Sequence, residues 1–151
     1  MKTNILSLSF GQVAATDKSP AHLVGELRVD GVRLGEGYVL DIRRLVEALT
    51  KEGEHFIFTC GCGDAGCAGI HDGVQSRISG DQVALAGSTP KGGAFSVFLS
   101  ASQARKSVAD ALVASSRLVR AIKREEDFEY PLMGFRQDKE LQFAVNVLSN
   151  A

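Results

Sequence analysis

The stretch IHDGVQSRISGDQVALAGSTPKGGAFSVFLSASQ, residues 70–103, contains the pattern that decides the fold class. Short runs rich in aliphatic and β-branched side chains predict three strands, over residues 70–78, 82–87 and 94–100. The turn-forming residues Gly80 and Asp81, and the stretch STPKGG, separate these runs. The pattern therefore predicts an antiparallel meander.

A long helix is predicted directly after the meander. Ser100 and Gln103 have the spacing of a capping box, which satisfies backbone N–H groups at the start of a helix. Small and apolar residues then recur three and four positions apart, which predicts one buried face of a helix over residues 101–126. The residues on this face are Val108, Ala111, Leu112, Ser115, Val119 and Ile122.

The C-terminal residues 139–149 fit two structures. Every second residue from Leu141 to Val147 is apolar, as in a half-buried strand. The helical alternative has an apolar stripe made by Leu141, Ala144, Val145 and Leu148. Because the two-residue period is the cleaner of the two, we expect a strand, separated from the long helix by the stretch FEYPLMGFRQD.

The first half of the chain predicts further strands. Residues 24–35 predict a β-hairpin, because Asp30-Gly31 lies between two alternating runs and tight hairpin turns need residues that adopt positive φ. Before it, the alternation of Leu6, Leu8 and Phe10 with serines predicts a strand, and the small polar residues 11–22 predict a loop.

A helix and a buried strand follow the hairpin. Residues 41–52 predict a helix that Asp41 caps and that ends at Gly53. The compact run EHFIFTC, residues 54–60, predicts a buried strand. The chain, residues 1–151, is therefore expected to be a single α+β domain with a largely antiparallel sheet and two helices.

Charge and composition narrow the classes of partner. The chain has 151 residues and a net charge of −1, so it has no long-range field to attract nucleic acid or an anionic membrane. The first residues lack the apolar length of an export signal, and no stretch has the apolar length of a membrane span. We therefore expect a cytoplasmic protein whose three cysteines are reduced.

All three cysteines lie in one glycine-rich stretch, FTCGCGDAGCAG, residues 58–69. Cys60, Cys62, Cys67 and the nearby His71 supply three thiolates and an imidazole, the ligand number of a closed zinc site. Cys60 and Cys62 are one residue apart, closer than the usual two to four residues between paired zinc ligands. Zinc is therefore the one cofactor that the sequence suggests, and it is not the favoured interpretation.

The same stretch has three other interpretations. A thiol-redox centre is disfavoured, because the nearest charges, Asp64 and Asp72, raise a thiol pKa. A phosphate-binding loop is disfavoured, because the glycines at 61, 63 and 66 are not followed by a helical pattern. The favoured interpretation is structural: a tight turn that leaves a buried strand and needs small residues.

The same stretch carries a resemblance. It fits the pattern FxFTCxCGxxGCAGxxxGV, which begins at Phe56 and ends at Val74. In this pattern the chain resembles a loose group of small, mostly uncharacterised bacterial proteins, over residues 41–80. The group's pattern has no histidine at position 71 and implies no established activity. Small bacterial proteins of this kind include immunity proteins that neutralise a toxin, and the resemblance adds that class as an analogy.

No catalytic constellation is evident in the sequence. The histidines His22, His55 and His71 are scattered, and no nucleophile elbow or metalloprotease motif is present. We therefore expect a non-enzymatic protein that binds a protein partner, with toxin neutralisation as the most concrete version. The alternative is a zinc-binding or thiol-redox protein centred on Cys60, Cys62 and Cys67.

Overall fold

The computed structural model describes residues 2–17, 20–60, 65–66, 69–88, 93–122 and 130–151. The strands are β1 (Leu6–Val13), β2 (His22–Val29), β3 (Val32–Leu34), β4 (Val39–Leu40), β5 (Gly53–His55), β6 (Phe58–Thr59), β7 (Val74–Ser79), β8 (Gln82–Ser88) and β9 (Ala94–Ser100). The helices are α1 (Ile42–Thr50), α2 (Ala101–Ala121) and α3 (Asp138–Asn150). The predicted single α+β domain is confirmed, and within the described residues it has three helices rather than two.

The predicted hairpin is confirmed as β2 and β3. Asp30 and Gly31 form its turn with φ values of 51° and 81°, the positive values that such a turn requires. The loop predicted over residues 11–22 is wrong at both ends, because β1 continues to Val13 and β2 begins at His22. In this region the backbones of β1 and β2 pair with each other. Most side chains in the second half of β1 are exposed, so the sequence shows no alternation of apolar and polar residues there.

The predicted meander is confirmed as β7, β8 and β9, with Gly80 at φ 57° in the first turn. The single strand predicted over residues 54–60 is wrong. The chain leaves β5, which pairs with β7, and enters β6, which pairs with β4. Between them, the carbonyl of Ile57 accepts a hydrogen bond from Asp41 N at 2.8 Å, so the chain turns toward the start of α1 instead of continuing one ladder.

One residue near the N-terminus joins two sheets. Asn4 donates its backbone N–H to Phe98 O at 2.6 Å and accepts from Phe98 N through its side chain at 2.9 Å. Its amide nitrogen also donates to the carboxylate of Asp30, in the hairpin turn, at 2.7 Å. The sheet β1–β2–β3 is thereby tied to β9, at the edge of the sheet β5–β7–β8–β9.

The helix α2 is capped at its predicted start. Ser100 accepts from Gln103 N, and the carboxylate of Asp81 accepts from Ser102 N at 2.8 Å. The predicted buried face is confirmed except at Ala111, which is half-buried. The helix ends at Ala121, because Ile122 is already extended, so the predicted end is wrong; residues 123–126 lie outside the described residues.

The strand predicted over residues 139–149 is wrong, because these residues belong to α3. The buried side chains are Leu141, Ala144 and Leu148, which have the three- and four-residue spacing of one helical face and pack against α2. Phe143, which would share the buried side in a strand, is 69% exposed. The helical alternative was therefore the correct one.

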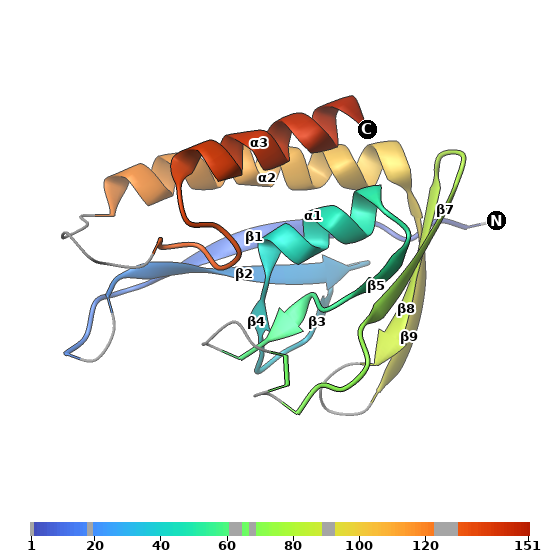
Figure 1. Cartoon of the computed structure of the whole chain (residues 1–151), viewed down its shortest axis with the longest axis horizontal. Helices are drawn as coiled ribbons and strands as arrows, with labels where there is room; N and C mark the ends of the chain where they lie inside the picture. The colour runs from blue at the N-terminus through green and yellow to red at the C-terminus, as the bar shows by residue number, and fades with distance from the viewer. Residues whose placement is uncertain (1, 18–19, 61–64, 67–68, 89–92, 123–129) are drawn as a thin grey trace.

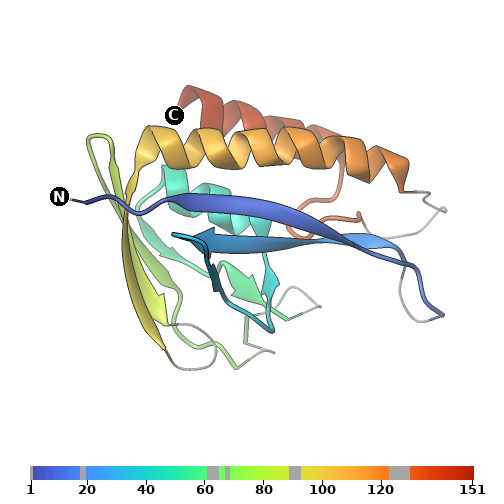
Figure 2. The ribbon, with the colours of Figure 1, turned by 180° about the vertical axis from the view of Figure 1, so that it is seen from behind.

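Figures 1 and 2 show α2 and α3 side by side along one face of the molecule. The helix α1 lies between them and the strands, in contact with α2, α3, β5 and β7. Its apolar face is fully buried, with Ile42, Leu45 and Leu49 at 0% exposure. No helix in the described part of the chain combines the length and apolar character needed to cross a bilayer.

Candidate functional site

The described part of the cysteine stretch forms a tight turn after a buried strand. Phe58 and Thr59 of β6 are buried, and Cys60 after them is half-buried. Gly69 N donates to Gly66 O at 3.0 Å and Ile70 N donates to Ala65 O at 3.0 Å, and Gly69 has φ 78°. The described residues between this turn and β7 include no helix of the kind that a phosphate-binding loop needs.

The zinc prediction is not tested by this structure. Of its four ligands, Cys62 and Cys67 lie outside the described residues, while Cys60 is half-buried and His71 is exposed. Among the residues that are described, no three His, Cys, Asp or Glu side chains lie together as a metal site would require. A zinc or thiol function of this stretch therefore stays a prediction.

The three histidines lie in separate places. His22 Nδ1 donates to Pro20 O at 2.9 Å at the start of β2. His55 is buried in β5, and its Nε2 donates to Lys51 O at 2.8 Å, just after α1. These contacts give His22 and His55 structural roles, while His71 is exposed ahead of β7.

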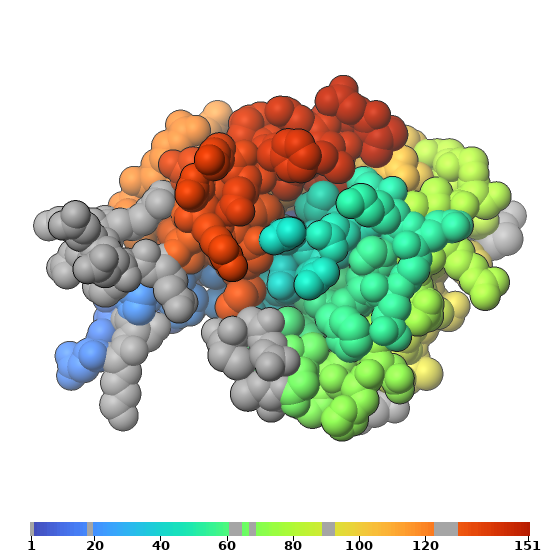
Figure 3. All heavy atoms as spheres, in the orientation of Figure 1, coloured from blue at the N-terminus to red at the C-terminus, as the bar shows by residue number. Residues whose placement is uncertain are grey.

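A groove of about 720 Å³ lies between α1 and α3. Figure 3 shows the face on which these two helices lie. The groove is lined by Arg43, Val46, Glu47, Thr50, Lys51, Phe135, Lys139, Glu140, Phe143, Ala144 and Val147. We refer to this surface as the α1–α3 groove.

The floor of the α1–α3 groove is apolar and comes from three parts of the chain. Three residues are buried at its base: Val46 of α1, Phe135 of the segment before α3, and Ala144 of α3. Phe143 and Val147 of α3 stand at its side, with Phe143 among the most exposed large apolar residues described. Apolar side chains of α3 lie on the side that packs against α2 and also on the side that lines the groove. The helix therefore has two apolar faces.

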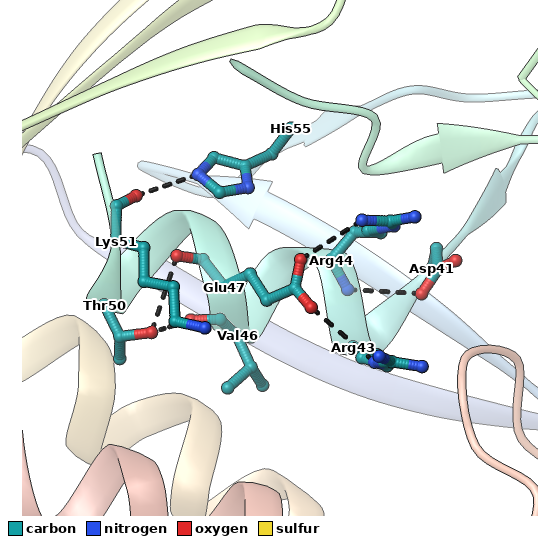
Figure 4. A network of polar contacts seen from close by, with 8 residues as sticks. All are labelled: Asp41, Arg43, Arg44, Val46, Glu47, Thr50, Lys51 and His55. Atoms are coloured by element: carbon teal, nitrogen blue, oxygen red, sulfur yellow. Dashed lines mark hydrogen bonds and ion pairs between the residues drawn. The ribbon is translucent and has the colours of Figure 1, made fainter. Parts of the chain in front are cut away.

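Charged side chains surround this floor, and the acidic ones are engaged. The carboxylate of Glu47 lies 3.6 Å from Arg43 Nε and 3.3 Å from Arg44 Nη1, as Figure 4 shows. Glu140 accepts a hydrogen bond from Arg136 N at 2.6 Å. In contrast, the exposed ammonium groups of Lys51 and Lys139 have no ion-pair partner among the described residues.

A close backbone contact fixes one end of the groove. Asp41 caps α1 by accepting from Arg44 N at 3.2 Å, and burial raises the pKa of its carboxyl group while this hydrogen bond opposes the rise. Gly134 has φ 100° and lies so close that an added Cβ would be 2.5 Å from Asp41 Oδ1 and 2.8 Å from Arg43 N. Phe135, the next residue, is buried and lines the groove.

Sequence reasoning missed the groove, because α3 was expected to be a strand. One signal was present: apolar residues at 141, 143, 144, 145, 147 and 148 exceed what one helical stripe can hold. A helix with that pattern has a second apolar face to cover.

No family model, no curated protein and no solved structure matches the chain. The resemblance to small bacterial proteins therefore remains a prediction made from one motif. Function has to be argued from the site itself.

Proposed function

We propose that the protein acts by binding another protein through the α1–α3 groove and does not catalyse a reaction. One observation carries the proposal: Phe143 is 69% exposed beside a hollow whose floor is already apolar. Aromatic side chains next to apolar hollows are the residues on which protein interfaces depend most, because covering them removes much apolar surface from water.

The polar groups of the groove support a binding role. The hydroxyl of Thr50 donates to Val46 O at 2.8 Å, and the carboxylates of Glu47 and Glu140 are held by basic or backbone groups. Groups held in this way stabilise the surface. Within the described lining, no hydroxyl or thiol faces a base in the arrangement that nucleophilic catalysis needs.

In its most concrete version, the proposal is that the protein resides in the cytoplasm and neutralises a toxin. This version is supported only by the motif resemblance and by the analogy with immunity proteins. The groove fits it, since neutralisation by binding needs an exposed docking surface and no catalytic group.

The test compares tagged wild-type protein with the variant Phe143→Asp in cells that express the protein. A partner is expected to copurify with the wild type, to bind it again after separate purification, and to be lost with the variant. The matched control is Phe98→Asp on β9, because Phe98 is also an exposed phenylalanine, at 37%, and is not part of the groove lining.

Two results would contradict the proposal. One is a reconstituted partner that binds the Phe143 variant as tightly as the wild type. The other is turnover of a small substrate that disappears when Cys60 or Cys62 is replaced, since this would assign the activity to the cysteine stretch. Protection of cells against a coexpressed toxin would support the toxin-neutralising version.

A further inference from the structure

We infer that the partner of the α1–α3 groove presents an amphipathic helix with apolar side chains along one face and carboxylates beside them. This inference rests on the proposed function and specifies the chemistry of the partner. It follows from the apolar floor, the charges at the rim and the nature of the groove walls.

The apolar floor sets the first requirement. Its apolar lining residues are Val46 of α1, Phe135, which precedes α3, and Phe143 and Val147 of α3. Apolar side chains contributed by both walls are matched by a partner with several apolar side chains on one face, which a helix provides at positions i, i+3, i+4 and i+7.

The rim sets the second requirement. The lining contains three cationic side chains, Arg43, Lys51 and Lys139. Its two carboxylates are engaged, by Arg43 and Arg44 at Glu47 and by Arg136 N at Glu140. Three cations against two carboxylates give the lining a net charge of +1, and Lys51 and Lys139 have no ion-pair partner among the described residues, so carboxylates on a partner would speed association and set specificity.

The walls explain why the partner segment is helical. Both walls are α-helices, whose backbone N–H and C=O groups are bonded within the helix except in the end turns. No strand residue belongs to the described lining, so it has no open strand edge to which an extended segment could add by backbone hydrogen bonds. Recognition has to use side chains, and laying a helix into a groove is the mode that does so.

Two other occupants fit the groove less well. A second copy of this chain, docked groove to groove, would bring Lys51 and Lys139 of both copies to one interface, where like charges repel. A small apolar molecule would be poorly enclosed, because Phe143 leaves 69% of its surface open to solvent, whereas small-molecule sites bury most of the ligand.

The first experiment selects binders from a displayed library of helical peptides with random charge and apolar spacing. The bait is the full-length protein, and Phe143→Asp serves as counter-bait. We expect peptides with apolar residues at i, i+3, i+4 and i+7 and an excess of Asp and Glu. Enrichment without an acidic excess would overturn the inference but leave the proposed function standing. Enrichment that is the same on both baits, or none, would overturn both.

The second experiment reverses charges and uses the best selected peptide. The double variant Lys51→Glu, Lys139→Glu should bind it on the order of ten-fold more weakly, because two exposed attractions become repulsions. A peptide with Lys in place of its acidic residues should then prefer the variant. The matched control is Arg77→Glu, Arg117→Glu, which reverses two exposed charges outside the groove lining and should leave the affinity unchanged.

The readouts also separate the other occupants. Equal loss of affinity in the control variant would show a general charge effect and would refute the inference. Concentration-dependent dimerisation that Phe143→Asp abolishes would assign the groove to a second copy. Saturable binding of a small apolar dye that Phe143→Asp abolishes, with no peptide enriched on the wild-type bait, would assign the groove to a small molecule and overturn the inference.

Discussion

Replacing Gly134 with alanine tests the contact that fixes the end of the groove. The backbone at Gly134 has φ 100°, which costs an alanine about 1 kcal/mol. The new Cβ would also lie 2.5 Å from Asp41 Oδ1 and 2.8 Å from Arg43 N. Relieving that overlap shifts the cap of α1, and a lost N-cap costs about 1 kcal/mol, with overpacking adding a similar amount.

The expected loss is thus about 3 kcal/mol in the free energy of unfolding, or a fall of about 6–12 °C in Tm for a domain of this size. Urea unfolding followed by far-UV circular dichroism measures it, with an unchanged m-value showing that both states keep their compactness. The matched control is Gly37→Ala, because Gly37 has φ 89° but nothing within 4 Å of an added Cβ. If both variants lose the same stability, the close contact with α1 has no energetic effect and the reasoning is refuted.

Three further predictions concern α3, the cap of α2 and the cysteine stretch. Leu141→Ala should cost about 3 kcal/mol and Phe143→Ala under about 1 kcal/mol, since Leu141 is 3% exposed and Phe143 69%; equal costs in urea unfolding would favour a strand. Asp81→Asn should lower stability at neutral pH, because hydrogen bonds from Ser102 N and from the hydroxyls of Ser100 and Ser102 lower the pKa of Asp81 below 3.8. That contribution is present above the ordinary pKa of 3.8 and is lost as the pH falls through the lower folded-state pKa, so the stability difference between wild type and variant should shrink steadily in urea titrations as the pH falls below 3.8; a difference that stays constant would contradict this origin. Protein purified without chelator should hold less than one zinc per chain and present three reactive thiols; one zinc per chain with protected thiols would instead support a site at Cys60, Cys62, Cys67 and His71.

Local signals in the sequence predicted much of the fold. Asp30-Gly31 predicted the hairpin and Asp41 and Ser100 predicted two helix starts, because turns and caps are decided by a few adjacent residues. The failures required tertiary information. The split of residues 54–60 between two sheets depends on which strands lie nearby, and the extension of β1 depends on backbone pairing that side chains do not reveal.

The α1–α3 groove could not be predicted for a related reason. A two-residue period and a helical stripe coexist in residues 141–148, and packing on α2 decides between them. Because Leu141 and Leu148 are buried on the side of α3 away from the groove, Phe143 and Val147 lie on the other side, in the groove lining. The groove is thus a consequence of helix packing and has no motif of its own.

The contacts of Asn4 bear on the order in which the chain folds. The meander and the start of α2 join residues close in sequence, with Asp81 and Ser102 only 21 positions apart, so this unit can form early. Asn4 and Phe98 are 94 positions apart, and their contact closes the longest loop among the side-chain hydrogen bonds described, apart from that between Leu6 and Ser107. During synthesis Asn4 is made early, and its partner Phe98 is made only after most of the chain. We expect the joining of the two sheets to be a late step, sensitive to any extension or truncation that reaches Asn4.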